Sequence, residues 1–273
     1  MSTDLPNILA SRYASEAMVK IWSPANKIVL ERELWIAVLE AQKDLGVHVP
    51  DGVIQAYRSV IDNVDLFAID ARERVTKHDV KARIEEFNEL AGHEHIHKGM
   101  TSRDLTENVE QLQIRSALNL VRDRIVTALS LVAQRAAEYS ELAIAGRSHN
   151  VPAQVTTVGK RFANIAEELL VAYERIDNLL VRYPLRGIKG PVGTQQDMLD
   201  LFQGDASKLD QLDNRIAKSL GFESCFDSVG QVYPRSLDFD VISALTQLSS
   251  APANFARTLR LMAGAELATE GFK

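Results

Sequence analysis

The feature that most constrains this chain is a run of 43 residues, from Arg103 to Ala145, that contains neither glycine nor proline. Apolar residues recur along it at the spacing of one helix face. They are Leu105, Val109, Leu112, Val121, Ile125, Leu129 and Val132. Thr101, just before this run, and Asp104, near its beginning, have the spacing of a capping box. We predict one helix of about 60 Å, which must pack against other long helices to bury its apolar stripe.

Two more long helices are predicted, from Pro152 to Tyr183 and from Ser236 to Glu270, and Pro252 should kink the second of these. Five shorter helices are also predicted, of which the first begins at Pro24 and stops before Gly46 and the fourth is closed by Gly92. Their ranges are 24–45, 51–61, 65–76, 79–90 and 206–220. Residues 185–235 are otherwise mixed and rich in glycine. The predicted fold class is therefore all-α, with an N-terminal helical domain over 1–101 and part of an elongated long-helix bundle over 102–273.

Composition narrows the class of function. The chain is 46% hydrophobic and 25% charged with a net charge of −6, which is typical of a globular protein and argues against nucleic-acid binding. No apolar run approaches the length of a membrane span, and the first residues lack the pattern of a secretory signal. The single cysteine, Cys225, lies between Phe222 and Phe226 and is interpreted as a packed thiol. We expect a cytoplasmic protein.

Two polar clusters lie in the N-terminal part of the chain. In SRYAS (11–15), Arg12 can bind a phosphate or carboxylate and Tyr13 can add a hydroxyl, although a surface strap is the plainer interpretation. In KHDV (77–80), Lys77 and His78 can both donate to an anion. Asp79 can either orient His78 or cap the following helix. The alternative for this cluster is a helix cap beside an exposed histidine.

A third cluster, HEHIHKGMTSRD (93–104), supports two different interpretations. His93, His95 and His97 alternate, so on a strand they would share one face and could bind zinc. Thr101 and Ser102 instead open the long helix, where free backbone N–H groups and hydroxyls form an anion site. We favour the second interpretation, because no cysteine or carboxylate completes a convincing ligand set.

The fourth cluster is GRSHNVPAQ (146–154), which the helix pattern places at a junction between two long helices. His149 lies at its centre, and histidine titrates near neutral pH, so it suits proton transfer. Loops on rigid scaffolds often hold reactive groups. The alternative is a histidine that is hydrogen-bonded within a turn. The polar neighbours Ser148 and Asn150 argue against deep burial.

Seven segments occur in the order and approximate spacing of one enzyme family. They are SRYAS, KHDV, TSRD (101–104), GRSHNVPAQ, VGKR (158–161), KGPVGTQ (189–195) and VGQVYPR (229–235). Together they resemble the adenylosuccinate lyases of the fumarase/aspartase superfamily along the whole chain. The resemblance implies an N-terminal helical domain, three of the long helices of a five-helix bundle, and a homotetramer in which bundles pack together. The family's C-terminal domain is not found in the chain.

The resemblance also implies an activity in purine nucleotide biosynthesis. The family eliminates fumarate from adenylosuccinate to give AMP, and from the succinylated aminoimidazole carboxamide ribotide, without a metal or organic cofactor. By resemblance His149 is the general acid and His78 supports it. The implied substrate-binding residues are Arg12, Tyr13, Lys77, His78, Asp79, Thr101, Ser102 and Gln231.

One element of the family pattern is not found. A flexible loop of the form GSSxMPxKxN carries the serine taken to be the general base, and it should follow EGFK (270–273). We therefore expect an N-terminal portion of such a lyase that has little or no activity alone. The alternatives are another fumarate-releasing lyase, such as argininosuccinate lyase or a fumarase, and a non-catalytic helical assembly fragment. The alternative that ranks last is a metal-binding protein built on His93, His95 and His97.

Overall fold

The computed structural model describes residues 7–265, which divide into two compact units. The first unit contains the residues up to Ala117 and returns for Arg182–Arg235. The second contains Leu118–Val181 and the residues from Ser236 onward. The predicted all-α class is confirmed, because helices dominate both units. The predicted domain boundary between residues 101 and 102 stays a prediction.

Helix α3 is the centre of the first unit. It spans Pro24–Asp44 and begins where the Ser23 hydroxyl accepts from Asn26 N at 3.2 Å, with proline in the first turn. Its core residues are Leu34, Trp35, Ile36, Val38 and Leu39, all buried. The predicted helix over 24–45 is thus confirmed.

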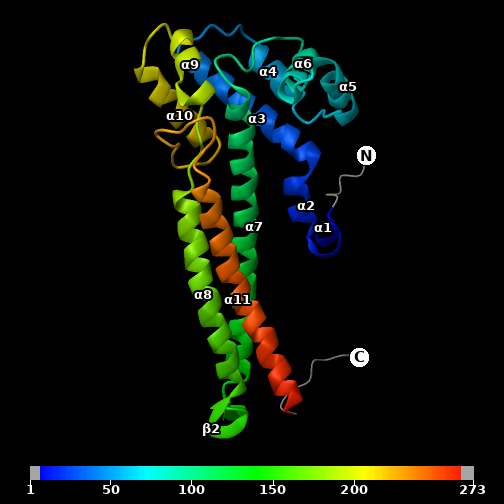
Figure 1. Ribbon diagram of the computed structural model, residues 1–273, viewed down its shortest axis with the longest axis vertical. Coiled ribbons are helices and arrows are strands. Elements are labelled where there is room, and N and C mark those ends of the chain that lie inside the picture. Colours follow the sequence, from blue (N-terminus) through cyan, green and yellow to red (C-terminus); the bar gives the residue numbers. More distant parts are fainter. Residues whose placement is uncertain (1–6, 266–273) are drawn as a thin grey trace. The chain divides into compact units, whose positions relative to one another are not determined.

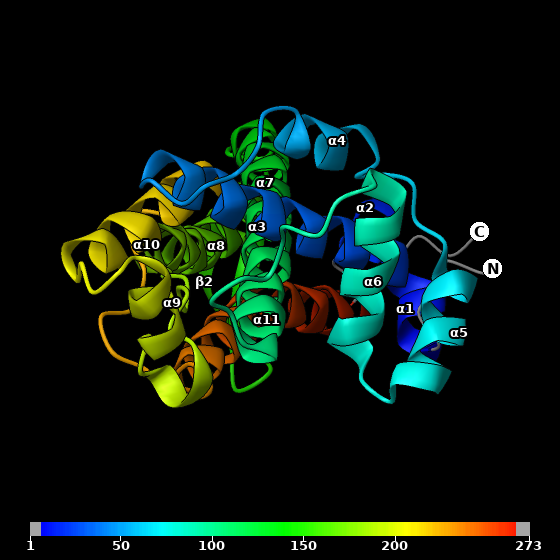
Figure 2. The ribbon, with the colours of Figure 1, turned by 90° about the horizontal axis from the view of Figure 1, so that it is seen from above.

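Short helices surround α3 in this unit. Helices α5 and α6 run side by side (Figure 2). The Arg32 guanidinium on α3 pairs with Glu86 on α6 at 2.7 Å, and both side chains are buried. Arg32 also donates to the carbonyls of Val60 and Ile61, so one arginine joins three segments. The bounds are α1 (Ile8–Tyr13), α2 (Glu16–Trp22), α4 (Val53–Ser59), α5 (Leu66–Thr76), α6 (Asp79–Ala91), η1 (Pro191–Gly193), α9 (Gln196–Leu201) and α10 (Ser207–Ser219).

The second unit is a three-helix bundle that ends in a β-hairpin. Helices α8 (Val158–Arg182) and α11 (Ser236–Gly264) run beside the C-terminal part of α7 (Ser102–Glu138) (Figure 1). Their shared apolar cluster contains Ile165, Leu169, Ala251, Ala128, Leu129, Val132, Leu248 and Phe255. On its polar side, Arg175 of α8 donates to Ser243 Oγ at 2.5 Å and to Gln247 Oε1 at 2.9 Å, both on α11.

The three long helices exist, but the predicted bounds of the first two are wrong where they approach each other. Helix α7 ends at Glu138 and α8 begins at Val158. Between them, β1 (Ala143–Ser148) pairs antiparallel with β2 (Val151–Thr157), and Pro152 lies in β2 instead of starting a helix. His149 and Asn150 form the two-residue turn, both with positive φ (52° and 64°), as a type I′ hairpin requires. The β-branched residues of 151–157 favour this extended pairing.

The remaining helix predictions are closer. The helices over 51–61, 65–76, 79–90 and 206–220 appear as α4, α5, α6 and α10, each within a few residues. Helix α11 contains Pro252 and extends to Gly264, and the rest of its predicted range lies outside the described residues. In residues 7–265, no helix is long and apolar enough to cross a membrane.

Candidate functional site

The TSRD segment opens α7 around a buried carboxylate. Asp104 has no exposed surface, and its Oδ2 accepts from the Thr101 backbone N–H at 2.8 Å. This is the carboxylate half of the predicted capping box. Thr101 and Ser102 remain half-buried at the helix start, so their hydroxyls and the first amides of α7 can meet an anion from solvent.

Arg186 joins that helix start to two distant loops. Its fully buried guanidinium donates from Nη1 to Asp104 Oδ1, and from Nη2 to the carbonyls of Gly190 and Gly230 at 3.3 and 3.2 Å. Asp104 Oδ1 also accepts from Lys189 N at 2.9 Å and Gly190 N at 3.1 Å. Burial raises the pKa of Asp104 above its usual value, and Arg186 with the Thr101 and Gly190 amides only partly offsets that rise. TSRD, KGPVGTQ and VGQVYPR therefore meet at one buried ion pair.

The two loops also contact each other through their backbones. A β-carbon added to Gly193, whose φ is +80°, would lie 1.9 Å from the Val229 carbonyl oxygen, so only glycine fits. Beside this contact, Gln231 Oε1 accepts from Val192 N at 2.7 Å. Gln231 is exposed. The side-chain carbonyl of Gln231 thus forms a hydrogen bond to the neighbouring loop. A role of Gln231 in substrate binding stays a prediction.

Sequence reasoning missed two buried charged groups next to this junction, Arg186 and Asp213. Asp213 pairs with Lys189 Nζ at 2.7 Å and accepts from Ile188 N at 2.8 Å. The available signal was RGIKG at 186–190, two basic residues set among glycines. Their partners are far along the chain, so no local pattern indicated them. Cys225 lies beside Asp213, and burial raises the pKa of this thiol to about 12.

The KHDV segment forms the N-terminus of α6. His78 is the N-cap residue, and its Nδ1 accepts from Lys81 N at 3.3 Å. Of the two roles considered for Asp79, capping the helix is therefore wrong: Asp79 is the first residue of the helix and pairs with Arg83 at 3.2 Å. Lys77 precedes the cap in the left-handed conformation, with φ 55°. The Lys77, His78 and Asp79 side chains are all at least partly exposed.

The three alternate histidines do not gather around a common point. His97 Nδ1 accepts from Trp35 Nε1 at 3.0 Å, and burial lowers the pKa of His97 to about 4. The rings of His93 and His95 lie with their centroids 6.4 Å apart. Over the described part of the chain, no three histidine, cysteine, aspartate or glutamate side chains are arranged to hold a metal ion.

The SRYAS segment covers the last turn of α1, which begins at the Asn7 cap and has no buried residue, and ends at Ser15, the N-cap of α2. Arg12 is in its last turn and Tyr13 ends it, with 77% of the Tyr13 side chain exposed. Within residues 7–265, neither side chain hydrogen-bonds to the other candidates. Both can reach a ligand from solvent, and the structure assigns them no partner in the site.

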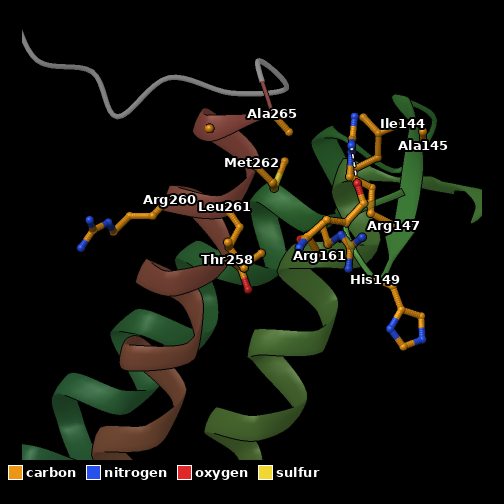
Figure 3. A pocket seen from close by; sticks show the side chains of 12 residues that line it. Ile144, Ala145, Arg147, His149, Arg161, Thr258, Arg260, Leu261, Met262 and Ala265 are labelled. Carbon is orange, nitrogen blue, oxygen red and sulfur yellow. Dashed lines mark hydrogen bonds between the residues drawn. The ribbon is translucent and has the colours of Figure 1, made fainter. Parts of the chain in front are cut away.

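His149 lies in the second unit, at the exposed tip of the hairpin. Strand β1, the hairpin turn, the start of α8 and the last turns of α11 line a cleft of about 640 Å³. Its lining residues include Arg147, His149, Arg161 and Met262. The His149 imidazole projects away from the other labelled side chains, while Arg147 donates to the Asn150 carbonyl (Figure 3). All other candidate residues belong to the first unit.

These positions can be set beside proteins already known. A protein-family model described as Lyase matches residues 13–271 of this chain. The chain belongs to this lyase family. Among its curated relatives is the adenylosuccinate lyase of Saccharomyces cerevisiae, 34% identical over 270 residues, which are 97% of this chain and 56% of the yeast protein. The adenylosuccinate lyase of Schistosoma mansoni is 33% identical over 98% of this chain and 56% of its own length.

Solved structures agree with the lyase-family fold. The 3-carboxy-cis,cis-muconate lactonizing enzyme from Pseudomonas putida superposes with a TM-score of 0.79 at 18% identity, covering 93% of this chain and 58% of that enzyme. The fumarate lyase from Mesorhizobium sp. BNC1 gives 0.78 at 19% identity, covering 92% of this chain and 58% of its own. The lyase chain described here spans just over half the length of the relatives it matches.

Proposed function

We propose that this chain is part of an adenylosuccinate lyase, which eliminates fumarate from adenylosuccinate to give AMP and from the succinylated aminoimidazole carboxamide ribotide. The observation that carries the proposal is the 34% identity to the yeast enzyme along 97% of the chain. The seven family segments add support, because they are spread from residue 11 to residue 235.

The chemistry assigns different work to each candidate residue. Elimination removes a proton next to a carboxylate and expels an amine nitrogen. By family resemblance the proton passes to the serine of the loop of the form GSSxMPxKxN, which is the general base. Negative charge grows on that carboxylate, so fixed donors at Thr101 and Ser102 would stabilise the transition state. Their position at the start of α7, fastened by the Asp104–Arg186 pair, supports this role. His149 would protonate the departing nitrogen as general acid, and its exposed turn position leaves the ring accessible.

The remaining candidates would bind the nucleotide. Arg12 and Tyr13 are assigned to the phosphate or ribose, and their exposure in α1 supports access from solvent. Lys77, His78 and Asp79 are assigned to a substrate-binding triplet at the start of α6, with His78 also supporting His149. Gln231 is assigned to substrate through its amide group. The reaction as proposed needs no metal or organic cofactor.

We further propose that the protein is a cytoplasmic homotetramer. Exposed apolar side chains on the long helices of the second unit support assembly, since soluble monomers rarely expose such stripes. Phe239 and Ile242 of α11 are examples, with 73% and 61% of their surface exposed.

Fumarate release tests the function directly. The 273-residue chain and the complete product of its reading frame are each incubated with adenylosuccinate, and fumarate is measured. In reverse, fumarate is offered with AMP or with arginine. We expect turnover by the complete product with the purine substrate. Turnover with arginine instead would replace the proposal by an argininosuccinate lyase, and no turnover with either pair would support a non-catalytic assembly protein.

His149→Ala in the complete product tests the general acid. Loss of proton transfer should lower kcat by about 10²- to 10⁴-fold. The matched control is His48→Ala, which removes an exposed histidine from the first unit and should leave kcat unchanged. A loss of less than tenfold for His149→Ala, or an equal loss for the control, would remove His149 from this role.

A further inference from the structure

His78 caps α6 with a ring nitrogen, and this fixes which nitrogen can carry the proton. The Lys81 backbone N–H donates to His78 Nδ1 at 3.3 Å. A nitrogen that accepts a hydrogen bond keeps its lone pair, so a neutral ring must carry its proton on Nε2. The side chain is 52% exposed. The helix start therefore leaves an Nε2–H donor available to a ligand.

Asp79 acts against this arrangement. Its Oδ1 lies 3.6 Å from the same His78 Nδ1. A carboxylate next to a ring nitrogen favours a proton on that nitrogen, and a proton on Nδ1 would break the bond from Lys81 N. The state of the ring thus depends on how strongly the Asp79 charge is engaged elsewhere.

Arg83 engages Asp79 from one turn further along α6. Its Nη2 lies 3.2 Å from Asp79 Oδ2, and its Nη1 donates to Glu31 Oε1 of α3 at 2.8 Å. Only 13% of the Arg83 side chain is exposed, and Glu31 has no exposed surface. The guanidinium is therefore held between a buried carboxylate and Asp79.

Glu31 is an unusual residue to bury. In the described part of the chain its Oε2 has no hydrogen-bond partner, and burial raises the pKa of Glu31 to about 7 despite Arg83 and Lys27. Burying a carboxylate with half of its acceptors unused is unfavourable. A role in holding Arg83 accounts for a group that packing alone does not explain.

We propose that Glu31 and Arg83 are positioning residues, which engage the charge of Asp79 so that His78 Nδ1 remains the acceptor for Lys81 N and Nε2–H is presented as a hydrogen-bond donor. The inference deepens the proposed function and rests on it for the identity of the acceptor, an anionic oxygen of the succinyl-purine nucleotide. The tautomer of the His78 ring is set by residues of this chain, so it can be measured without substrate.

The test measures the tautomer of His78 by the ¹⁵N chemical shifts of its ring in protein labelled at histidine, at about pH 9, where neutral imidazole predominates. In the unaltered chain we expect the proton on Nε2. Glu31→Gln with Arg83→Gln frees Asp79 without leaving a buried unpaired charge. The Nδ1–H form should then rise about tenfold, a change that corresponds to about 1.4 kcal/mol.

Adding Asp79→Asn to that double variant should return the proton to Nε2, because the competing carboxylate is gone. The matched control is Arg74→Gln, which breaks the exposed Arg74–Asp70 pair on neighbouring α5 and should not move the tautomer. An unchanged His78 ring in the double variant, or no return with Asp79→Asn, would overturn the proposal. A purely structural role would change the unfolding free energy and leave the ring as it is.

Kinetics separate this inference from the proposed function. In the complete product of the reading frame, the double variant should raise KM for adenylosuccinate about tenfold and change kcat less, since a binding donor is lost. If the ring responds as expected but the protein releases no fumarate, the function fails and the positioning roles stand. If the protein is active and its ring does not respond, the positioning roles fail alone.

Discussion

Single buried groups decide much of the behaviour of the first unit. His97 is an example, because its ring is tied to Trp35 and its pKa lies at about 4 instead of 6.5. Asp104 and Arg186 are a second example, since one carboxylate and one guanidinium join three segments. At this scale the sequence indicated that these segments matter, but it did not indicate how their side chains pair.

His97 should make the stability of the first unit depend on pH. Its folded-state pKa of about 4 lies below the unfolded value of 6.5, so the unfolded state binds more protons between these values. The contribution is complete above about pH 6.5 and is lost as pH falls towards 4, to an extent of roughly 3 kcal/mol. His97→Asn removes the titration and keeps a residue that tolerates the positive φ of 65° at this position.

The measurement is the free energy of unfolding by urea at several pH values. The difference between the unaltered chain and His97→Asn should shrink steadily from pH 7 to pH 4.5. Taking the difference cancels groups common to both, including Glu31, whose raised pKa acts with the opposite sign. His48→Asn is the control at an exposed site. A constant difference across the pH range would contradict the expectation.

Among the elements, the long helices could be predicted and the hairpin could not. The apolar stripe, Pro24 and the Thr101–Asp104 spacing are local signals, and they correctly defined the start of α3 and the start of α7. The absence of glycine and proline up to Ala145 permits a helix but does not require one. The strand pairing over 143–157 comes from residues across the turn, and the close approach of Gly159 to the backbone of Ala136 and Ser140 is also tertiary.

The same reasoning limits the candidate site. Thr101, Ser102 and the cap at Asp104 follow from local spacing. Arg186 is 82 residues from Asp104, and Gln231 is 39 residues from the Val192 amide that it binds. Contacts over such separations have no sequence period. The sequence marked the segments that make these contacts as family segments, but it did not indicate which residues in them touch.

Gly193→Ala tests the backbone contact between the KGPVGTQ and VGQVYPR loops. The new β-carbon would lie 1.9 Å from the Val229 carbonyl oxygen and would also strain a φ of +80°. We expect a loss of unfolding free energy of about 3 kcal/mol or more, the sum of backbone strain and a forced shift. The measurement is urea unfolding of the purified chain.

Gly204→Ala is the matched control, because Gly204 has a similar φ of +87° and no atom within 4 Å of the added β-carbon. It should lose only the strain, about 1–2 kcal/mol. Equal losses for the two variants would mean that the Gly193 contact contributes nothing beyond its dihedral angle.

For the whole molecule, the chain passes between its two compact units more than once. It leaves the first unit within α7, returns at Arg182, the last residue of α8, and leaves again at Ser236. Neither unit is therefore one continuous stretch of sequence. The proposed tetramer adds a further level, in which the apolar face of α11 is buried by other copies of the chain.

The double variant Phe239→Asp with Ile242→Asp tests whether this face of α11 is an interface in the proposed tetramer. The two residues are one turn apart on α11, so both charges would fall on one exposed face. If the face is an interface, sedimentation velocity should show the assembly falling to the mass of one chain, because buried unpaired charges are strongly unfavourable. Phe67→Asp, at a side chain of α5 that is 64% exposed, is the control. Unchanged mass in the double variant would contradict an interface on this face.

The buried carboxylate of Asp104 has a consequence for local opening. The amide protons of Lys189 and Gly190 lie in an irregular segment, yet both bind a carboxylate 85 and 86 residues earlier in the chain. Hydrogen exchange at these two amides requires the segment to separate from the start of α7. They should exchange as slowly as amides of the core helices, and so report the opening of the entire first unit from within a loop.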